Sequence, residues 1–249
     1  MFSDYAKLYL QDCHIPMVQQ LSSYTIYFVI IDEARYCCEV ANGKTAWAEM
    51  LEIIAPAIDL LGSLCPDGVR LRFLNNPEAC CDGVRSFEQV KQFFSALPRT
   101  GHGRCLDLLR KVFSECKDSP NALSKVFLAM PGPPADSTPH KEMRKAHKEF
   151  REVLTKDRQI RFCTISILLN TNNEGYAHLF RCLDKEIDAL DVTDDLEATR
   201  EAAKRVKRKK HRMKGLFGMK TGATDVAHMI DFKYLLAKFL CEELDDIDG

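Results

Sequence analysis

The sequence lacks the motifs that mark several common classes of enzyme and membrane protein. It contains no phosphate loop of the form G-x-x-x-x-G-K-S and no G-x-S-x-G motif, so neither nucleotide hydrolysis nor serine-hydrolase chemistry is indicated. The longest apolar run, Tyr24 to Ile31, is far shorter than the roughly 20 residues of a membrane-spanning helix. Asp4, Lys7 and Asp12 interrupt the region where a signal peptide would be apolar. We therefore expect a non-enzymatic protein of the cytosol or nucleus, without a membrane span.

Disulfide frameworks are also not indicated, although the chain has 11 cysteines. No two of them form a C-x-x-C pair, and four are directly adjacent as Cys37-Cys38 and Cys80-Cys81. Secreted scaffolds held by disulfides are typically much shorter and have an even number of cysteines. We expect these thiols to pack as small apolar side chains in a reducing compartment.

What the sequence does have is the composition of a folded soluble domain, with 46% hydrophobic and 29% charged residues. Nearly continuous or alternating apolar residues predict buried strands at 24–31, 69–74, 125–130 and 159–169. Apolar spacings of three and four predict helices at 47–62, 86–97, 103–115, after 139, and at 176–190 and 226–245. Pro56 is expected to bend the first of these helices. Alternating strands and helices predict an α/β fold, with a doubly wound, mostly parallel sheet covered by helices on both faces.

The first buried strand ends on an acidic residue in the segment FVIIDEARYCC. In doubly wound sheets, ligands bind at the carboxyl ends of the strands. Asp32 lies at such an end, so it is the first candidate for a functional residue. We expect one domain over 1–249, with a core at about 22–193, a basic insertion at about 198–222 and a C-terminal helix at about 226–245.

Several segments resemble the von Willebrand factor type A domain, in particular the intracellular version common in fungi. They are SYTIYFVIIDEARY, IIAPAIDLLG, PDGVRLRFLNN, SFEQVKQFFSALP and CLDKEIDAL. In that family a strand-end Asp-x-Ser-x-Ser motif, a loop Thr and a later Asp bind Mg²⁺ through oxygen ligands, and a partner's carboxylate often completes the shell. The resemblance implies the fold described above and a protein-interaction module.

The resemblance places the metal-ligand positions at Asp32, Ala34, Tyr36, His102 and Met130-Pro131. Of these, only Asp32 supplies a suitable carboxylate, because the others have no side-chain oxygen, hold it too far out or offer nitrogen. Glu33 and Asp136 are the nearby carboxylates that could substitute. We expect a degenerate site with no bound Mg²⁺ and no other cofactor.

Residues of the same region also suggest two other kinds of site, a zinc site and a cysteine nucleophile. His102 and Cys105 form an H-x-x-C pair that is typical of half a zinc site, but a second closely spaced pair is missing. Cys37 or Cys38 with His102 could form a nucleophile and base, which would also need a third, orienting group. Neither pattern is complete, and the alternative is that these residues serve packing and loop structure.

The resemblance also implies where a partner would bind, because that family uses the loops at the carboxyl ends of its strands. In this chain those loops are 32–38, 75–84, 100–104 and 130–137. Tyr and Arg are enriched at interfaces. The candidate contacts are Asp32, Arg35, Tyr36, His102 and Arg104.

The highest charge density lies at 200–214, where nine Lys or Arg and one Glu give a formal charge of +8 in a chain whose net charge is -1. We call eight cations of this segment the basic patch: Lys204, Arg205, Lys207, Arg208, Lys209, Lys210, Arg212 and Lys214. A solvated charged face is one interpretation. The alternative is nuclear import or attraction to nucleic acid or another anionic surface, without base stacking because no aromatic residue interleaves with the cations.

Overall fold

The computed structural model describes residues 23–33, 36, 45–95, 104–119, 123–130, 143–157, 163–169, 174–187 and 190–193. The chain divides into two compact units, Val18–Asp194 and Met1–Met17 together with Asp195–Gly249. All of the described residues belong to the first unit. The expected basic insertion and C-terminal helix lie outside the described residues, and the single-domain organisation stays a prediction.

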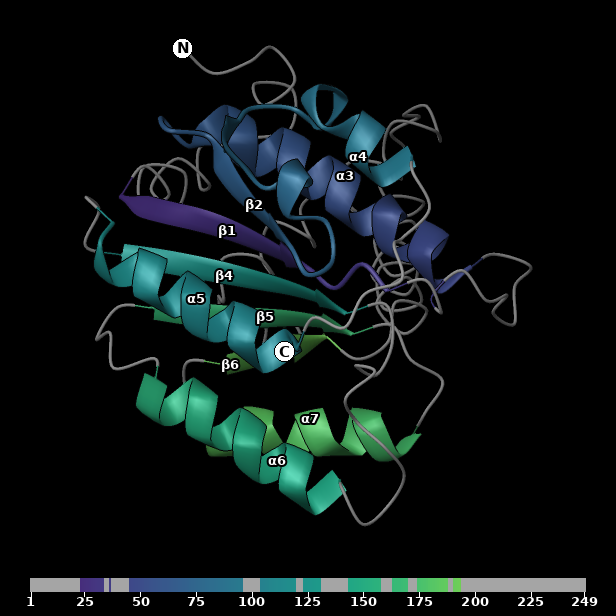
Figure 1. Ribbon diagram of the computed structural model, residues 1–249, viewed down its shortest axis with the longest axis vertical. Helices are drawn as coiled ribbons and strands as arrows, with labels where there is room; N and C mark the ends of the chain where they lie inside the picture. The colour runs from purple at the N-terminus through teal and green to yellow at the C-terminus, as the bar shows by residue number, and fades with distance from the viewer. Residues whose placement is uncertain are drawn as a thin grey trace, which may run out of the picture. The chain divides into compact units, whose positions relative to one another are not determined.

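The described part of the chain forms a six-stranded sheet in the order β3-β2-β1-β4-β5-β6 (Figure 1). Neighbouring strands are parallel except for β3, which runs antiparallel to β2 at one edge. Because β2 and β4 flank β1, the winding changes direction at β1, which is the switch point of a doubly wound sheet. The strands are β1 Tyr24–Ile30, β2 Val69–Phe73, β3 Cys81–Val84, β4 Leu123–Met130, β5 Cys163–Leu169 and β6 Leu190–Thr193.

Helical segments connect these strands. In α3 the hydroxyl of Thr45 accepts a hydrogen bond from the backbone N–H of Ala48 at 3.1 Å, and the helix continues through Pro56. The α-helices are α3 Ala46–Leu64, α4 Lys91–Ser95, α5 Cys105–Lys117, α6 Met143–Glu152 and α7 Glu174–Glu186. Shorter segments are the 3₁₀ turns η3 Pro77–Ala79 and η4 Phe87–Gln89 and the π-helical η5 Val153–Asp157.

The helices cover both faces of the sheet. Successive residues of a strand point to opposite faces of the sheet. The contacts of Arg72 and Phe73 in β2 therefore show which helix covers each face. Arg72 binds Glu115 of α5, whereas the ring of Phe73 lies 5.2 Å from that of Phe94 in α4. Phe94 in turn stacks against Trp47 of α3. Figure 1 shows the same layers, with α3 and α4 on one side of the strands and α5 on the other.

The centre of the core is β1, as its continuous apolar sequence predicts. Every residue from Ile26 to Ile31 is fully shielded from solvent. Phe28 stacks on Phe127 of the neighbouring β4 with ring centroids 5.1 Å apart. The prediction of an α/β fold with a mostly parallel sheet flanked by helices is therefore confirmed.

Three local predictions differ from the structure. The helix expected at 176–190 is α7, which ends at Glu186, and Leu190 begins β6, a strand that the sequence did not predict. The helix expected at 86–97 is divided into η4 and α4, because Val90 between them leaves the helical conformation. The loop expected at 75–84 contains η3 and the whole of β3. Residues 81–84 have the sequence CDGV, which lacks the pattern of a strand. They form a strand because they pair with β2.

Candidate functional site

The carboxyl end of β1 is held against its two neighbours by backbone hydrogen bonds. Ile31 N–H donates to the carbonyl of Ala129, and Leu74 N–H donates to that of Ile30. These bonds bring the residues after β1 and β2 together at the same edge of the sheet. Asp32, which follows them, has only 4% of its surface exposed.

Asp32 accepts hydrogen bonds from Asn75, which lies two residues beyond the end of β2. The backbone N–H of Asn75 donates to Oδ1 of Asp32 at 2.8 Å, and the Asn75 side-chain amide donates to the Asp32 carbonyl at 3.1 Å. Two hydrogen bonds from one residue fix the strand ends relative to each other, and a charged acceptor makes the first of them stronger. The carboxylate therefore has a structural role that explains its burial.

These contacts bear on whether Mg²⁺ fits the site. A hard cation needs several oxygen ligands in near-octahedral array. One Asp32 oxygen already accepts a hydrogen bond, and Tyr36, at a serine position of the resembled motif, is buried with 4% exposure. Glu33 adds one carboxylate, but no group of three His, Cys, Asp or Glu among the described residues is placed to hold a metal ion. The donor set among the described residues does not fit a magnesium shell.

Tyr36 lies in the turn that follows the strand, where its backbone N–H donates to the carbonyl of Glu33 at 3.0 Å. Glu33 is also buried, with 6% exposure. With 4% exposure, Tyr36 differs from the expectation of a surface contact. Among the described residues of this turn, Tyr36 therefore contributes to the core.

Arg104 is the candidate contact that the structure places on the surface. It is the N-cap of α5, its side chain is 53% exposed, and its guanidinium lies 3.9 Å from the carboxylate of Glu149. The other predicted positions, Ala34, Arg35, His102 and Pro131, lie outside the described residues, as does the whole basic patch. Met130 is described and fully buried at the end of β4.

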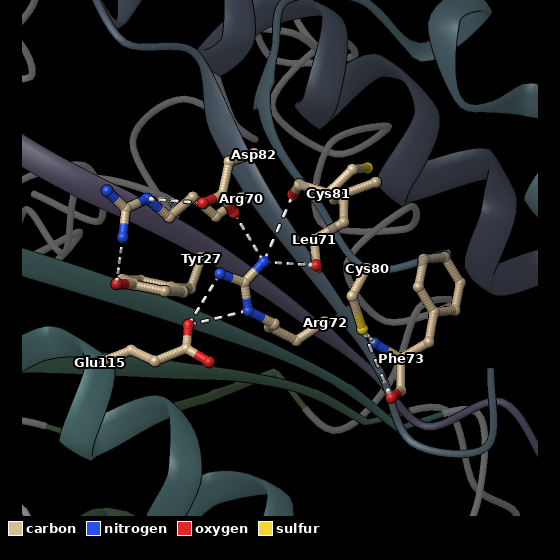
Figure 2. Close-up of polar contacts among 9 residues, drawn as sticks. All are labelled: Tyr27, Arg70, Leu71, Arg72, Phe73, Cys80, Cys81, Asp82 and Glu115. Carbon is tan, nitrogen blue, oxygen red and sulfur yellow. Dashed lines mark hydrogen bonds and ion pairs between the residues drawn. The ribbon is translucent and has the colours of Figure 1, made fainter. Parts of the chain in front are cut away.

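A second polar group lies on the α5 face of the sheet, and Figure 2 shows how its side chains converge. Arg72 donates from Nε to Glu115 at 2.8 Å and from Nη1 to Asp82 at 2.7 Å. Arg70 donates to the hydroxyl of Tyr27 at 2.9 Å. We call these five residues the arginine cluster. It connects β1, β2, β3 and α5.

The arginine cluster shifts the acidity of its own members. Burial raises the pKa of Tyr27 to about 12, and the charge of Cys116 acts in the same direction while that of Arg70 opposes it. Burial lowers the pKa of Arg72, but the hydrogen bonds that Arg72 donates to Glu115 and Asp82 outweigh this effect and raise the pKa above its ordinary value. Two cations face two carboxylates here, which is the arrangement of a structural ion-pair network.

Sequence reasoning missed the asparagines that follow β2. Asn75 holds Asp32, and Asn76 is buried with its Oδ1 lacking a hydrogen-bond donor among the described residues. The run Asn75-Asn76 after an apolar strand was the available signal, since Asn side chains commonly bond nearby backbone groups. The Arg70-x-Arg72 alternation in β2 was the signal for the arginine cluster.

Across the described ranges, no group of three His, Cys, Asp or Glu is placed to hold a metal ion. Cys105, half of the predicted H-x-x-C pair, is the first residue of α5 and is buried, while His102 is not described. None of the described helices is both long and apolar enough to cross a membrane.

Comparison with known proteins finds matches among solved structures. No family model and no curated protein matches the chain. The D319A mutant of the PilB minor pilin from Streptococcus sanguinis aligns with 88% of this chain at 9% identity and a TM-score of 0.46. The alignment spans 63% of that pilin chain. A likeness at this level carries no argument about function.

Proposed function

We propose that the chain is a von Willebrand A-like interaction module that binds a protein partner at the carboxyl ends of its strands without a metal ion. The observation that carries the proposal is the pair of hydrogen bonds from Asn75 to Asp32. The carboxylate that resembles a metal ligand serves instead to fix the strand ends. Attachment at this edge then depends on side chains rather than on a shared cation.

The strand order supports the location of the binding surface. A sheet that switches its winding at β1 opens a crevice at the carboxyl ends of the strands on either side of the switch. Arg104 lies at the start of α5, the helix that leads into β4, and it is more than half exposed. A planar, multiply donating guanidinium is suited to a partner's carboxylate or carbonyl groups.

The proposal is tested by affinity purification of partners from the native organism. Arg104→Ala should reduce recovery of a specific partner several-fold, because interface arginines are frequently dominant contacts. Arg110→Ala is the matched control, since Arg110 is on the same helix with a 47% exposed side chain and pairs with the nearby Asp107 at 3.0 Å. Recovery with Arg110→Ala should equal that of the unmodified protein.

The same purification with a chelator tests the metal-free mechanism. Partners should be recovered equally with and without EDTA, because no bridging cation is needed. Loss of every partner in EDTA would refute metal-independent attachment. If Arg104→Ala and Arg35→Ala both leave the recovery of partners unchanged, the strand-end surface is not the binding surface.

We also propose an alternative function, favoured by the +8 charge of residues 200–214. In it, the basic patch attracts nucleic acid or another anionic surface through neutralisation of phosphates. The test is retention on heparin or on generic DNA at low salt, before and after the lysines and arginines of the patch are neutralised. Failure of the intact protein to bind at low salt would eliminate this alternative.

A further inference from the structure

The exposed face of α7 carries a histidine and a cysteine whose side chains are in contact. Sγ of Cys182 lies 3.6 Å from Nε2 of His178, and the contact is open to solvent. Residues four positions apart on a helix are neighbours on one face, which is why these two side chains meet. His178 is exposed, and Cys182 is partly exposed with a free thiol. Both atoms are therefore accessible to an ion in solution.

The helix that carries this pair is fixed on its inner side. Phe180 and Leu183 are fully buried, and Phe180 meets Phe150 of α6 edge-to-face with ring centroids 5.3 Å apart. Near the end of α7, Glu186 binds Arg151 of α6 at 3.2 Å. The two candidate ligand atoms thus project from a packed helix, which holds a metal site more precisely than a loop does.

The distance between the two atoms is the one that zinc requires. Zn²⁺ binds thiolate sulfur at about 2.3 Å and imidazole nitrogen at about 2.0 Å, with tetrahedral angles between its ligands. Two such bonds place the sulfur and the nitrogen about 3.5 Å apart, and the separation of Sγ and Nε2 here is 3.6 Å. A zinc ion therefore fits between the two atoms, in place of the hydrogen that they share.

The chemistry of the two atoms selects the kind of ion. Thiolate and imidazole ligands favour Zn²⁺ and related transition metals, whereas Mg²⁺ and Ca²⁺ are bound by oxygen. The two carboxylates that follow Cys182 in α7 are engaged elsewhere, because Asp184 accepts from the backbone N–H of Val192 and Glu186 binds Arg151. No third His, Cys, Asp or Glu of the described residues is placed to join the pair.

We propose that His178 and Cys182 bind Zn²⁺ on the surface of α7, and that the ion keeps its other two coordination positions for water or for ligands from another molecule. This inference does not depend on the proposed function, because it uses neither the strand-end surface nor the basic patch. As the ion binds, the Cys182 thiol releases its proton to solvent and the His178 imidazole coordinates in its neutral form through Nε2. The ion then links two successive turns of α7.

The first test uses Co²⁺, which occupies tetrahedral zinc sites and absorbs light when bound to thiolate. Titration of the untagged, reduced full-length protein should give the near-ultraviolet absorption of a cobalt–thiolate bond, and added Zn²⁺ should remove it. The absorption should fall in Cys182→Ser and in His178→Ala. No absorption in the unmodified protein, or equal absorption in the unmodified protein and Cys182→Ser, would overturn the proposal.

The matched control is Cys81→Ser, which should keep the cobalt absorption of the unmodified protein. Cys81, in β3, is also partly exposed, but burial raises the pKa of its thiol and so disfavours the thiolate that zinc needs. Loss of the absorption in Cys81→Ser with its retention in Cys182→Ser would place the metal at β3 and refute the site on α7.

A second measurement needs no variant and is independent of how the variants fold. The unmodified protein is alkylated with iodoacetamide in the presence and absence of Zn²⁺, and mass spectrometry follows each cysteine over time. Zinc should slow the alkylation of Cys182 several-fold and leave that of Cys81 unchanged, because a coordinated sulfur is shielded from the reagent. Equal alkylation rates at Cys182 with and without Zn²⁺ would overturn the proposal.

Discussion

Arg72 is the residue whose loss should cost the most stability among the members of the arginine cluster. Its side chain is 10% exposed, and Arg72→Met would leave the carboxylate of Glu115, itself 25% exposed, without its cation. Removing one partner of a largely buried pair destabilises by about 3 kcal/mol. Urea unfolding measures the loss, and adding Glu115→Gln should restore part of it because the two changes are coupled.

Arg70 provides the control for that prediction. It is 25% exposed, and its ion pair with Asp82 is 3.9 Å long. Arg70→Met should cost about 1 kcal/mol, mainly through the lost hydrogen bond to Tyr27. Equal losses for the two arginine variants would contradict the assignment of Arg72 as the central cation.

Tyr27 should make stability depend on pH in the alkaline range. Its pKa is raised by burial from 10.0 to about 12, so between these values the unfolded chain has lost a proton that the folded chain keeps. The stabilisation is complete below pH 10 and is lost as pH rises toward 12, by about 2 kcal/mol. The slope of unfolding free energy against pH over this range should be shallower in Tyr27→Phe. Equal slopes for the unmodified protein and Tyr27→Phe would contradict the assignment of this pH dependence to Tyr27.

At the scale of elements, Gly62 lets α3 pack closely against the end of β3. A Cβ at this position would lie 2.7 Å from the carbonyl oxygen of Val84 and 2.9 Å from Cα of Arg85. Alanine normally stabilises a helix by roughly 1 kcal/mol relative to glycine. We expect Gly62→Ala to destabilise instead, by about 2 kcal/mol in urea unfolding, because the backbone must move to relieve the overlap.

The neighbouring position gives a matched comparison. The hydroxyl of Ser63 bonds the carbonyl of Leu60 within the same helix, so Ser63→Ala should change stability by less than about 0.5 kcal/mol. A stabilising effect of Gly62→Ala would show that the contact between α3 and β3 is looser than described.

The predictability of the elements follows their local sequence signals. The buried strand β1 was predictable because Ile26 to Ile31 are apolar without interruption, and α5 because its apolar residues repeat at helical spacing. Residues 81–84 were not, since an aspartate and a glycine carry no strand signal. In the candidate site, Asp32 was predicted from its position, whereas the role of Asn75 depends on the pairing of β1 with β2.

For the whole molecule, we expect thermal stability to be independent of Mg²⁺ and Mn²⁺. An ion that binds the folded state would raise the melting temperature, because its stabilisation grows with the logarithm of one plus the ratio of its concentration to its dissociation constant. Adding Mg²⁺ or Mn²⁺, or removing metals with EDTA, should leave the melting temperature unchanged within about 1 °C. Micromolar binding by calorimetry, lost in Asp32→Asn, would show that the strand-end oxygens assemble a shell after all.

The sequence by itself determined the four central strands β1, β2, β4 and β5, most of the helices, and that the first strand ends on Asp32, because periodicity and side-chain type are local properties. The tertiary structure decided the strand order, the antiparallel edge strand and the partner of Asp32, which lies 43 residues away along the chain. Contacts between distant residues depend on sheet register and helix placement, and these are set when the apolar faces of all the elements are buried together.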